Sequence, residues 1–355
     1  MLVSIVARRI AHSIFLLLAV LTFTFIMIHL VPGSPVDYLT DSRLSPETIA
    51  TIRKDLGMNA TLPSQYFRWL KNFLTGDFGY SFSQQRPVAS VLRDAIPATL
   101  MLTVSAFLLE LALGVFFGVL AAINYRRKVG HFINIIALTL FGIPEFWLGL
   151  MAILVFSIEW HLFPSGQTVT LGSGNVHLFS HLADLLHHLV LPVLVLALGS
   201  AAYTTRFVRG NMLGILQKEF ILQSRLFGIS SKTIYFKYAL KNTLLPVVTL
   251  IGLGFPFLLS GSLVVEYLFS WPGMGWLTFH AVLTRDYPVI LASTTLIAIM
   301  VILGNLFSDL LYPLVDPRIK YAGKVESHSL NAPKKGKEWE RQMSGVKSVR
   351  GGQDR

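Results

Sequence analysis

The sequence predicts an all-α membrane protein with six transmembrane helices, an external insert after the first helix and a cytoplasmic loop between the fourth and fifth. Two features of the composition of this 355-residue chain support that class: 53% of the residues are hydrophobic and only 14% are charged. The mean hydropathy is also positive. Such values are typical of chains whose main solvent is lipid rather than water.

Six apolar runs have the length that a membrane-spanning helix needs, because a hydrocarbon core of about 30 Å takes about 20 residues at the helical rise. Arg8 and Arg9 precede the first run, which is too long for a cleaved signal peptide and lacks a small-residue cleavage site, so it is predicted to be an uncleaved signal anchor. The runs cover approximately residues 10–31, 99–123, 133–158, 185–203, 244–265 and 289–314.

The Lys and Arg residues predict the orientation, because loops rich in them stay on the cytoplasmic side. Arg8 and Arg9, the cluster at 126–128 and the loop at 206–241 are basic, whereas residues 129–205 contain no Lys or Arg and the loop after Val265 contains only Arg285. We therefore expect both termini in the cytoplasm. The net charge of +11 belongs to these cytoplasmic segments, and no nucleic-acid partner is predicted.

The chain divides by composition into four parts. Residues 1–31 are the first helix, and residues 32–98 are an extracytoplasmic insert in which Ser45-Pro46-Glu47-Thr48 predicts a helix start. Residues 99–316 form the core, with the cytoplasmic loop at 206–246. Residues 317–355 form a polar, basic cytoplasmic tail whose composition predicts disorder.

Enzyme motifs are missing from the sequence. It contains neither G-x-x-x-x-G-K-[ST] for phosphate, nor H-E-x-x-H for zinc, nor G-x-S-x-G for acyl transfer, and with no cysteine it has no thiol chemistry. We predict no catalytic residues and no bound metal. If the protein drives transport, the energy comes from an ion gradient or from another subunit.

A few polar residues lie within or near the apolar runs. Glu110 and Glu145 are candidates for a channel or gating role, with interhelical hydrogen bonding or a water-filled cavity wall as the alternative for Glu110. Asp309 and Asn305 are expected to bond neighbouring helices. His177 and His181 have a spacing that could place two imidazoles on one helix face, with His187 and His188 nearby, but solvated or interfacial side chains fit this loop better than a metal site.

The cytoplasmic loop carries large apolar residues. If residues 213–227 are helical, Leu213, Leu216, Phe220 and Phe227 form one stripe, and Gly228 ends the helix. A second apolar patch, Ile234 to Tyr238, precedes Pro246. The loop therefore predicts two short helices, whose apolar faces either lie on the membrane surface or bind a partner.

The chain resembles the B-type permeases of the dipeptide, oligopeptide and nickel subfamily of binding-protein-dependent ABC importers over about residues 1–320. Glu219, Gly228, Ile234 and Leu245-Pro246 match the spacing of that family's cytoplasmic loop. Further matching segments follow in order: GDFGYS at 76–81, IPATL at 96–100, GIPEFWLGL at 142–150, RFVRGNML at 206–213, VEYLFSWPGMG at 265–275, RDYPV at 285–289 and NLFSDLLYPLVDPRIK at 305–320.

The resemblance implies that the loop forms coupling helices that seat in a groove of a separate ATP-binding subunit. The coupling residues it implies are Glu219, Phe220, Ser224, Arg225, Gly228, Ile234 and Pro246. The chain departs from the family in having Ser224-Arg225-Leu226-Phe227-Gly228 where relatives usually read Ala-Arg-Ala-Lys-Gly, and Phe220 where Tyr is common.

The resemblance also implies a bacterial inner-membrane importer that works by alternating access. Its parts would be this chain, a second homologous permease, two subunits that bind ATP and Mg, and an external substrate-binding protein; this chain would bind no cofactor. Trp271, Pro272 and Gly273 would form an external turn near the channel mouth, which either contacts the binding protein or only joins two helices. Asp316-Pro317-Arg318 would end the last helix. Peptides are the leading substrate, with nickel chelates, glutathione or sugars as others. The alternative class is an ion-coupled carrier or channel that needs no ATPase.

Overall fold

The computed structural model describes residues 2–30, 60–169 and 178–315. The segment Ser45-Pro46-Glu47-Thr48, the tail at 317–355 and Asp316-Pro317-Arg318 lie outside these residues. Of the described residues, those up to Asp309 belong to one compact unit. The described part is mostly helical, and its single small sheet is an antiparallel pair of two-residue strands, β1 (Tyr80–Ser81) and β2 (Arg86–Pro87).

Four helices of the described part are long and apolar enough to cross a membrane: Ala11–Leu30 within α1 (Leu2–Leu30), α5 (Val88–Ile123), Phe179–Leu216 within α8 (Leu178–Leu216), and Tyr287–Phe307 within α14 (Tyr287–Val315). Two bent pairs of helices raise the number to six if each pair is counted as one span. The predicted class, a helical membrane protein, is confirmed by these four to six candidate spans. Helix α5 begins eleven residues before the apolar run, inside the region expected as the external insert.

The third apolar run, expected as one helix over 133–158, is broken in the structure. It forms α6 (Lys128–Gly142) and then α7 (Glu145–Ala152), which continues into a π-helical stretch, η1 (Ile153–Glu159). The two parts differ in direction by 102°. Ile143 has extended backbone angles, as the residue before a proline usually does, and Pro144 begins the second part. The proline therefore divides the run.

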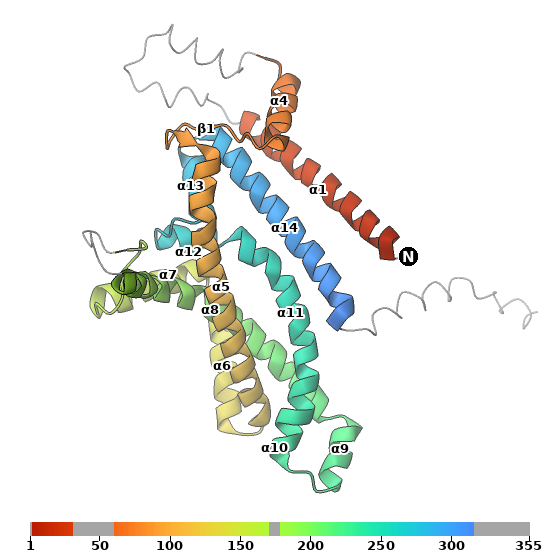
Figure 1. Cartoon of the computed structure of the whole chain (residues 1–355). Coiled ribbons are helices and arrows are strands. Elements are labelled where there is room, and N and C mark those ends of the chain that lie inside the picture. The colour runs from red at the N-terminus through yellow and green to blue at the C-terminus, as the bar shows by residue number, and fades with distance from the viewer. Residues whose placement is uncertain (1, 31–59, 170–177, 316–355) are drawn as a thin grey trace, which may run out of the picture. The chain divides into compact units, whose positions relative to one another are not determined.

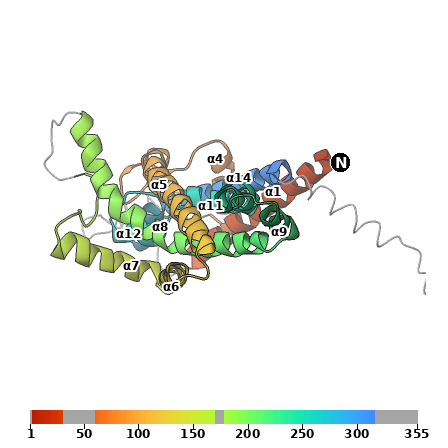
Figure 2. The ribbon, with the colours of Figure 1, turned by 90° about the horizontal axis from the view of Figure 1, so that it is seen from below.

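Helices α5 and α8 form the centre of the bundle and run side by side (Figures 1 and 2). Two glycines of α5 bring the helices close together. A Cβ atom at Gly114 would lie 2.6 Å from Thr204 Cβ, and one at Gly118 would lie 2.6 Å from Val208 Cβ. Small residues at such positions let membrane helices approach closely. Helix α6 packs on α8 beside this pair.

The described part of the segment that was predicted to be an external insert packs on α1. Helix α4 (Leu62–Leu74) places Tyr66 against Phe25 of α1 with ring centroids 5.2 Å apart, and the Tyr66 hydroxyl lies 2.8 Å from Thr22 Oγ1. Phe25 joins a buried cluster with Val88 and Val91 of α5 and Val289 of α14. The insert is thus tied to three membrane helices.

The loop that was predicted to be cytoplasmic differs from its predicted form in two ways. Helix α8 ends at Leu216 and α9 (Glu219–Leu226) begins after Lys218, whose backbone is extended, so residues 213–227 are not one helix. The predicted stripe from Leu213 to Phe227 was wrong in that respect. The second short helix is not separate either, because α10 (Ser231–Thr233) continues through η2 (Ile234–Ala239) into α11 (Leu240–Ser260).

The chain then forms a compact turn before its last membrane helix. Gly261 ends α11 with a φ of +76°, a conformation that glycine adopts readily. Two short helices follow, α12 (Leu263–Leu268) and α13 (Met274–Leu283), and both contact each other before α14 begins.

Candidate functional site

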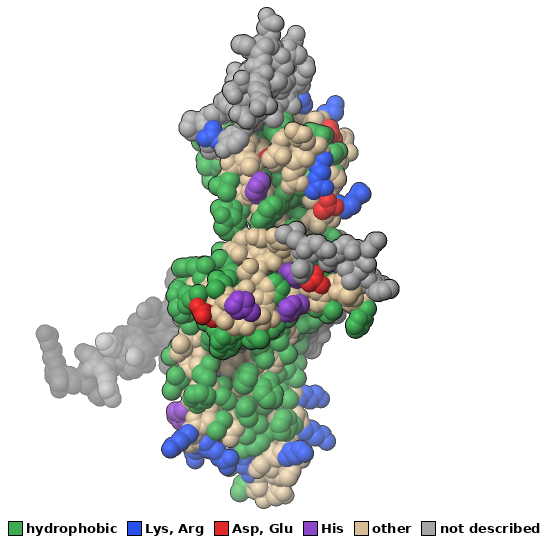
Figure 3. All heavy atoms as spheres, turned by 90° about the vertical axis from the view of Figure 1, so that its left-hand side faces the viewer, with side chains coloured by type: hydrophobic (Ala, Val, Ile, Leu, Met, Phe, Trp, Pro, Cys, Tyr) green, Lys and Arg blue, Asp and Glu red, His purple; other side chains and the backbone are tan. Residues whose placement is uncertain are grey.

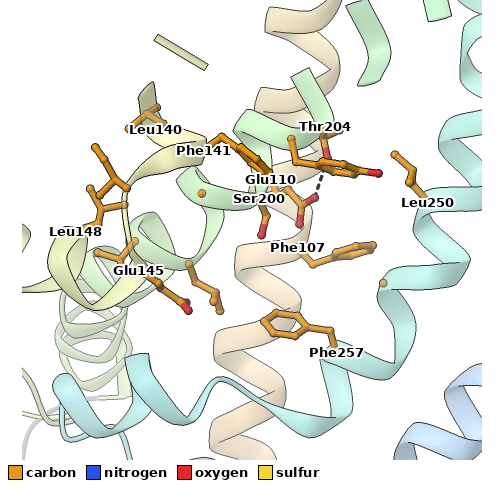
Figure 4. Close-up of a pocket in the computed structure, with 16 residues that line it drawn as sticks. Phe107, Glu110, Leu140, Phe141, Glu145, Leu148, Ser200, Thr204, Leu250 and Phe257 are labelled. Carbon is orange, nitrogen blue, oxygen red and sulfur yellow. Dashed lines mark hydrogen bonds between the residues drawn. The ribbon is translucent and has the colours of Figure 1, made fainter. Parts of the chain in front are cut away.

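A cavity of about 540 Å³ lies among α5, α6, α7, α8 and α11. Most of its lining is apolar, with Phe107, Phe141 and Phe257 among the side chains, but two carboxylates belong to it. Glu110 comes from α5 and Glu145 from the start of α7, and both project toward the space that the helices enclose (Figure 4). The sequence indicated these two acidic residues as candidates for a channel or gating role. They are 35 positions apart in the chain, and the structure brings them to the same cavity.

Each carboxylate has a hydroxyl partner, one on helix α8 and one on the residue that precedes α12. Thr204 Oγ1 on α8 donates a hydrogen bond of 2.8 Å to Glu110 Oε1, and Ser262 Oγ donates one of 3.3 Å to Glu145 Oε1. Glu110 is half-buried and Glu145 is exposed. Glu145 also stands in the first turn of α7, where a negative charge is favoured by the helix dipole. Within the described part of the chain, neither carboxylate has an ion-pair partner.

A buried hydrogen-bond network holds the turn between α12 and α13. Glu266 of α12 is fully buried, and its carboxylate accepts hydrogen bonds from Thr99 Oγ1 at 2.9 Å, Gly275 N at 2.7 Å and Trp276 N at 3.1 Å. The two backbone donors lie at the start of α13, where a carboxylate complements the unpaired N–H groups. Glu266 was not among the candidate residues that the sequence indicated. An acidic residue next to a Gly- and Pro-rich turn was the available signal.

Trp271, Pro272 and Gly273 lie in this turn. Trp271 is only 1% exposed, and its indole N–H donates to the carbonyl of Ala98 at 2.8 Å. A Cβ atom at Gly273 would lie 2.5 Å from Glu266 Oε2. Within this chain, Trp271 therefore anchors the turn to the start of the second apolar run, and Gly273 leaves room for the carboxylate.

The carboxylate of Asp286 joins the insert to the segment before α14. Asp286 is fully buried, and its Oδ2 accepts from Ser81 Oγ at 2.6 Å, Ser83 Oγ at 2.7 Å and Ser83 N at 2.9 Å. Four of the sequence segments quoted above thus meet in pairs. GDFGYS joins RDYPV through Ser81 and Asp286, and IPATL joins VEYLFSWPGMG through Thr99 and Glu266.

Helix α9 presents an apolar surface that the described part of the chain leaves uncovered. We call the side chains of Phe220, Leu222, Leu226, Phe227 and Phe236 the α9 surface. Leu226 and Phe227 are 80% and 84% exposed. Ile221 and Ile234 face the other way and are buried, so they hold α9 against η2. Lys and Arg side chains gather at the lower end of the molecule, below a broad apolar band (Figure 3).

The predicted coupling residues take different positions in α9, η2 and α11. Glu219 begins α9 and is exposed, and the exposed Arg225 lies in its last turn. Ser224 Oγ donates to the carbonyl of Phe220 at 2.7 Å. Pro246 lies inside α11 and is half-buried. Ile234 is buried, as described above, so it is not part of the α9 surface.

Gly228 ends α9 in the way that the sequence predicted. Its φ is +73°. Its N–H donates to the carbonyl of Arg225 at 3.0 Å, and the N–H of Ile229 donates to the carbonyl of Ser224 at 3.1 Å. This pair of bonds is the Schellman motif, which requires a left-handed residue that is usually glycine.

The histidines form ordinary local contacts. His187 Nε2 lies 2.8 Å from the carbonyl of Leu162, and His188 Nδ1 lies 2.9 Å from the carbonyl of Asp184. No group of three or more His, Asp or Glu side chains in the described residues is arranged to hold a metal ion. His177 lies outside those residues.

The fold and the cavity define a helical membrane protein with an internal space that contains two carboxylates. Residues 114–321 match the family described as binding-protein-dependent transport system inner membrane component. Residues 1–103 match the family of N-terminal regions of such membrane components. The chain belongs to this family and is the permease component of a binding-protein-dependent ABC transporter.

Relatives align along nearly their whole length. The oligopeptide transport system permease protein AppB of Bacillus subtilis is 38% identical over 317 residues, which cover 89% of this chain and 99% of the relative. The glutathione transport system permease protein GsiC of Escherichia coli is 34% identical over 316 residues, 89% of this chain and 98% of the relative. A putative peptide permease protein of Brucella suis is 34% identical, with 88% and 98% covered.

Family membership decides between the two classes that the sequence left open. A permease component of this kind is a non-catalytic membrane subunit, and ATP is hydrolysed by a separate subunit. The ion-coupled carrier is therefore set aside. The family also places the chain in the inner membrane as a multi-pass protein.

Proposed function

We propose that this chain forms half of the pathway through which an importer moves peptides or glutathione across the membrane, with a second homologous permease forming the other half. The names of its relatives support peptides and glutathione as the substrate class. The observation that carries the proposal is the cavity of about 540 Å³ between five helices. It brings into an apolar space two carboxylates that form no ion pair with any residue the structure describes.

The α9 surface is the docking site for an ATP-binding subunit in this proposal. An exposed apolar patch of this kind marks a partner site more often than a solvated face. Leu226 and Phe227, which depart from the family pattern, are its most exposed members, so the groove that receives them is apolar and wide. Two such ATP-binding subunits, each with ATP and Mg, would serve the two permeases. The basic end then faces the cytoplasm, together with both termini.

The turn held by Glu266 faces the opposite side, where the substrate-binding protein docks. Trp271, Pro272 and Gly273 act there by fixing the shape of the surface, and Glu110 and Glu145 line the channel between the two ends. Closure of the ATP-binding subunits moves α9, and ATP favours the outward-facing state to the extent that it binds more tightly to that state.

The experiment compares two sets of proteoliposomes. One contains the complete complex, purified with its second permease and ATP-binding subunits and supplied with its binding protein, and the other contains this chain alone. We expect uptake of radiolabelled tri-alanine or glutathione only by the complete complex, and only with ATP. Uptake by the chain alone, driven by a proton or sodium gradient, would contradict the proposal.

A further inference from the structure

A second cavity adjoins the first along α8. It has a volume of about 490 Å³ and is lined by Asn134, Phe141, Tyr203, Arg206, Phe207 and Arg209. Phe141 and Tyr203 line both cavities. The two spaces therefore share a wall of aromatic rings, with carboxylates on one side and guanidinium groups on the other.

The rings of this wall are arranged in a row. Phe141 and Tyr203 stack with ring centroids 6.4 Å apart, and Tyr203 and Phe207 stack at 6.3 Å. The Arg206 guanidinium lies 5.7 Å from the centroid of Phe141. Such rings offer an apolar face to the middle of a ligand while the charged groups at either end bind its polar ends.

The charges of the two cavities are not neutralised by each other. Glu110 and Glu145 have only hydroxyl partners, and neither Arg206 nor Arg209 forms an ion pair within the described part of the chain. The Nε atom of Arg209 is buried and has no hydrogen-bond acceptor there. A buried donor without an acceptor is unfavourable, so a ligand that supplies an anionic oxygen would be stabilised at this point.

We propose that the two cavities together bind a zwitterion: a short peptide with its amino terminus toward Glu110 and Glu145 and its carboxyl terminus toward Arg206 and Arg209. This inference rests on the proposed peptide transport. The dimensions agree with it: Ser200 lines the first cavity and Arg209 lines the second, and the nine helical steps between them rise roughly 13 Å along α8. An extended chain covers about 3.3–3.6 Å per residue, so a peptide of three or four residues fits.

The test measures equilibrium binding of three radiolabelled peptides to the detergent-purified permease complex without its binding protein, whose own selectivity would mask that of the cavities. The peptides are tri-alanine, N-acetyl-tri-alanine, which lacks the ammonium group, and tri-alanine amide, which lacks the carboxylate. The variants are E110Q/E145Q and R206Q/R209Q. E159Q and R127Q, at exposed positions outside both cavities, are the controls.

The expected result is a crossed pattern. E110Q/E145Q weakens binding of tri-alanine and its amide by about fivefold or more and leaves the acetylated peptide within about twofold, whereas R206Q/R209Q weakens tri-alanine and the acetylated peptide and spares the amide. The controls change none of the three. If a double variant does not elute as a single species, E145Q and R206Q, whose side chains are exposed, replace it.

Two outcomes would overturn the inference. Equal losses for all three peptides would mean that these side chains maintain the structure or bind lipid headgroups. Absence of binding by the parental complex at about 10 mM tri-alanine would mean that the cavities are not a peptide site. Either outcome leaves the proposed function intact if ATP-driven uptake of tri-alanine by the complete complex continues.

Discussion

The carboxylate of Glu266 accepts a hydrogen bond of 2.9 Å from the hydroxyl of Thr99, a residue 167 positions earlier in the chain. The same hydroxyl oxygen accepts a bond of 2.7 Å from the N–H of Met274 at the start of α13. This pair joins the start of the second apolar run to the turn that precedes the last membrane helix. All of its groups are buried, so water cannot replace a missing partner.

Replacing Glu266 with Gln should destabilise the protein by about 1–3 kcal/mol, because the two N–H groups of α13 lose a charged acceptor and the Thr99 hydroxyl loses the oxygen to which it donates. The measurement is the thermal midpoint of the purified protein in detergent. E159Q, at an exposed position, is the matched control. An unchanged midpoint for E266Q would show that the network adds nothing to stability.

Two Gly→Ala substitutions should shift that thermal midpoint in opposite directions. At Gly273 a Cβ atom would crowd Thr99 Oγ1 and lie 2.5 Å from Glu266 Oε2, so G273A should lower the midpoint. At Gly210, inside α8, a Cβ atom meets nothing within 4 Å. There alanine favours the helix by up to about 1 kcal/mol. Equal effects of the two substitutions would argue against the crowding at Gly273.

The sequence indicated much of this fold, because the signals involved are local. Apolar runs of membrane length appear in the structure as helices, and Gly228 ends α9 where a glycine after an amphipathic stretch suggested it. The break at Pro144 was harder to predict from the sequence. Proline is tolerated in many membrane helices, as Pro97 in α5 and Pro192 in α8 show. Only packing decides that Pro144 separates two helices by 102°.

The candidate site was predictable only in part. Glu110 and Glu145 stood out as carboxylates in apolar surroundings, but their common cavity depends on how α5, α7 and α8 pack. The partnership of Glu266 with Thr99 and that of Asp286 with Ser81 join residues far apart in sequence, so no local pattern reveals them. The break between α8 and α9 at Lys218 was also not predicted, because the apolar periodicity of the sequence continues across it.

Replacing the two most exposed apolar side chains of the α9 surface with serine should weaken the association with the ATP-binding subunits without unfolding the chain. Leu226 and Phe227 are 80% and 84% exposed, so the double substitution L226S/F227S removes apolar area that the chain itself does not bury. We expect loss of the ATP-binding subunits on gel filtration and an unchanged thermal midpoint for the isolated chain. I221A, which truncates a fully buried side chain, should instead lower the thermal midpoint, because it reduces the free energy of unfolding by about 2–5 kcal/mol.

The Schellman motif at Gly228 predicts a graded effect on coupling. A Cβ atom there meets nothing within 4 Å, so any cost of substitution arises from the φ of +73° alone. G228A should cost about 1 kcal/mol, and G228N less, because asparagine tolerates the left-handed region. ATP-driven uptake per ATP hydrolysed should therefore fall in the order Gly, Asn, Ala, with G214A as the helical control. If uptake per ATP hydrolysed is the same in all variants, the Schellman motif at Gly228 has no part in coupling ATP hydrolysis to transport.

In the proposed mechanism, energy from ATP enters this permease through α9, and single-cysteine cross-linking is the sharpest test of that route. The chain has no cysteine of its own, so each introduced thiol is unique within it. In the complete complex, a benzophenone attached at L226C or F227C should form adducts with the ATP-binding subunit, in a yield that changes with ATP. I221C, at a buried position, and F116C, exposed on the membrane helix α5, should form none with that subunit. Adducts absent from L226C and F227C, or equally abundant from F116C, would contradict the claim.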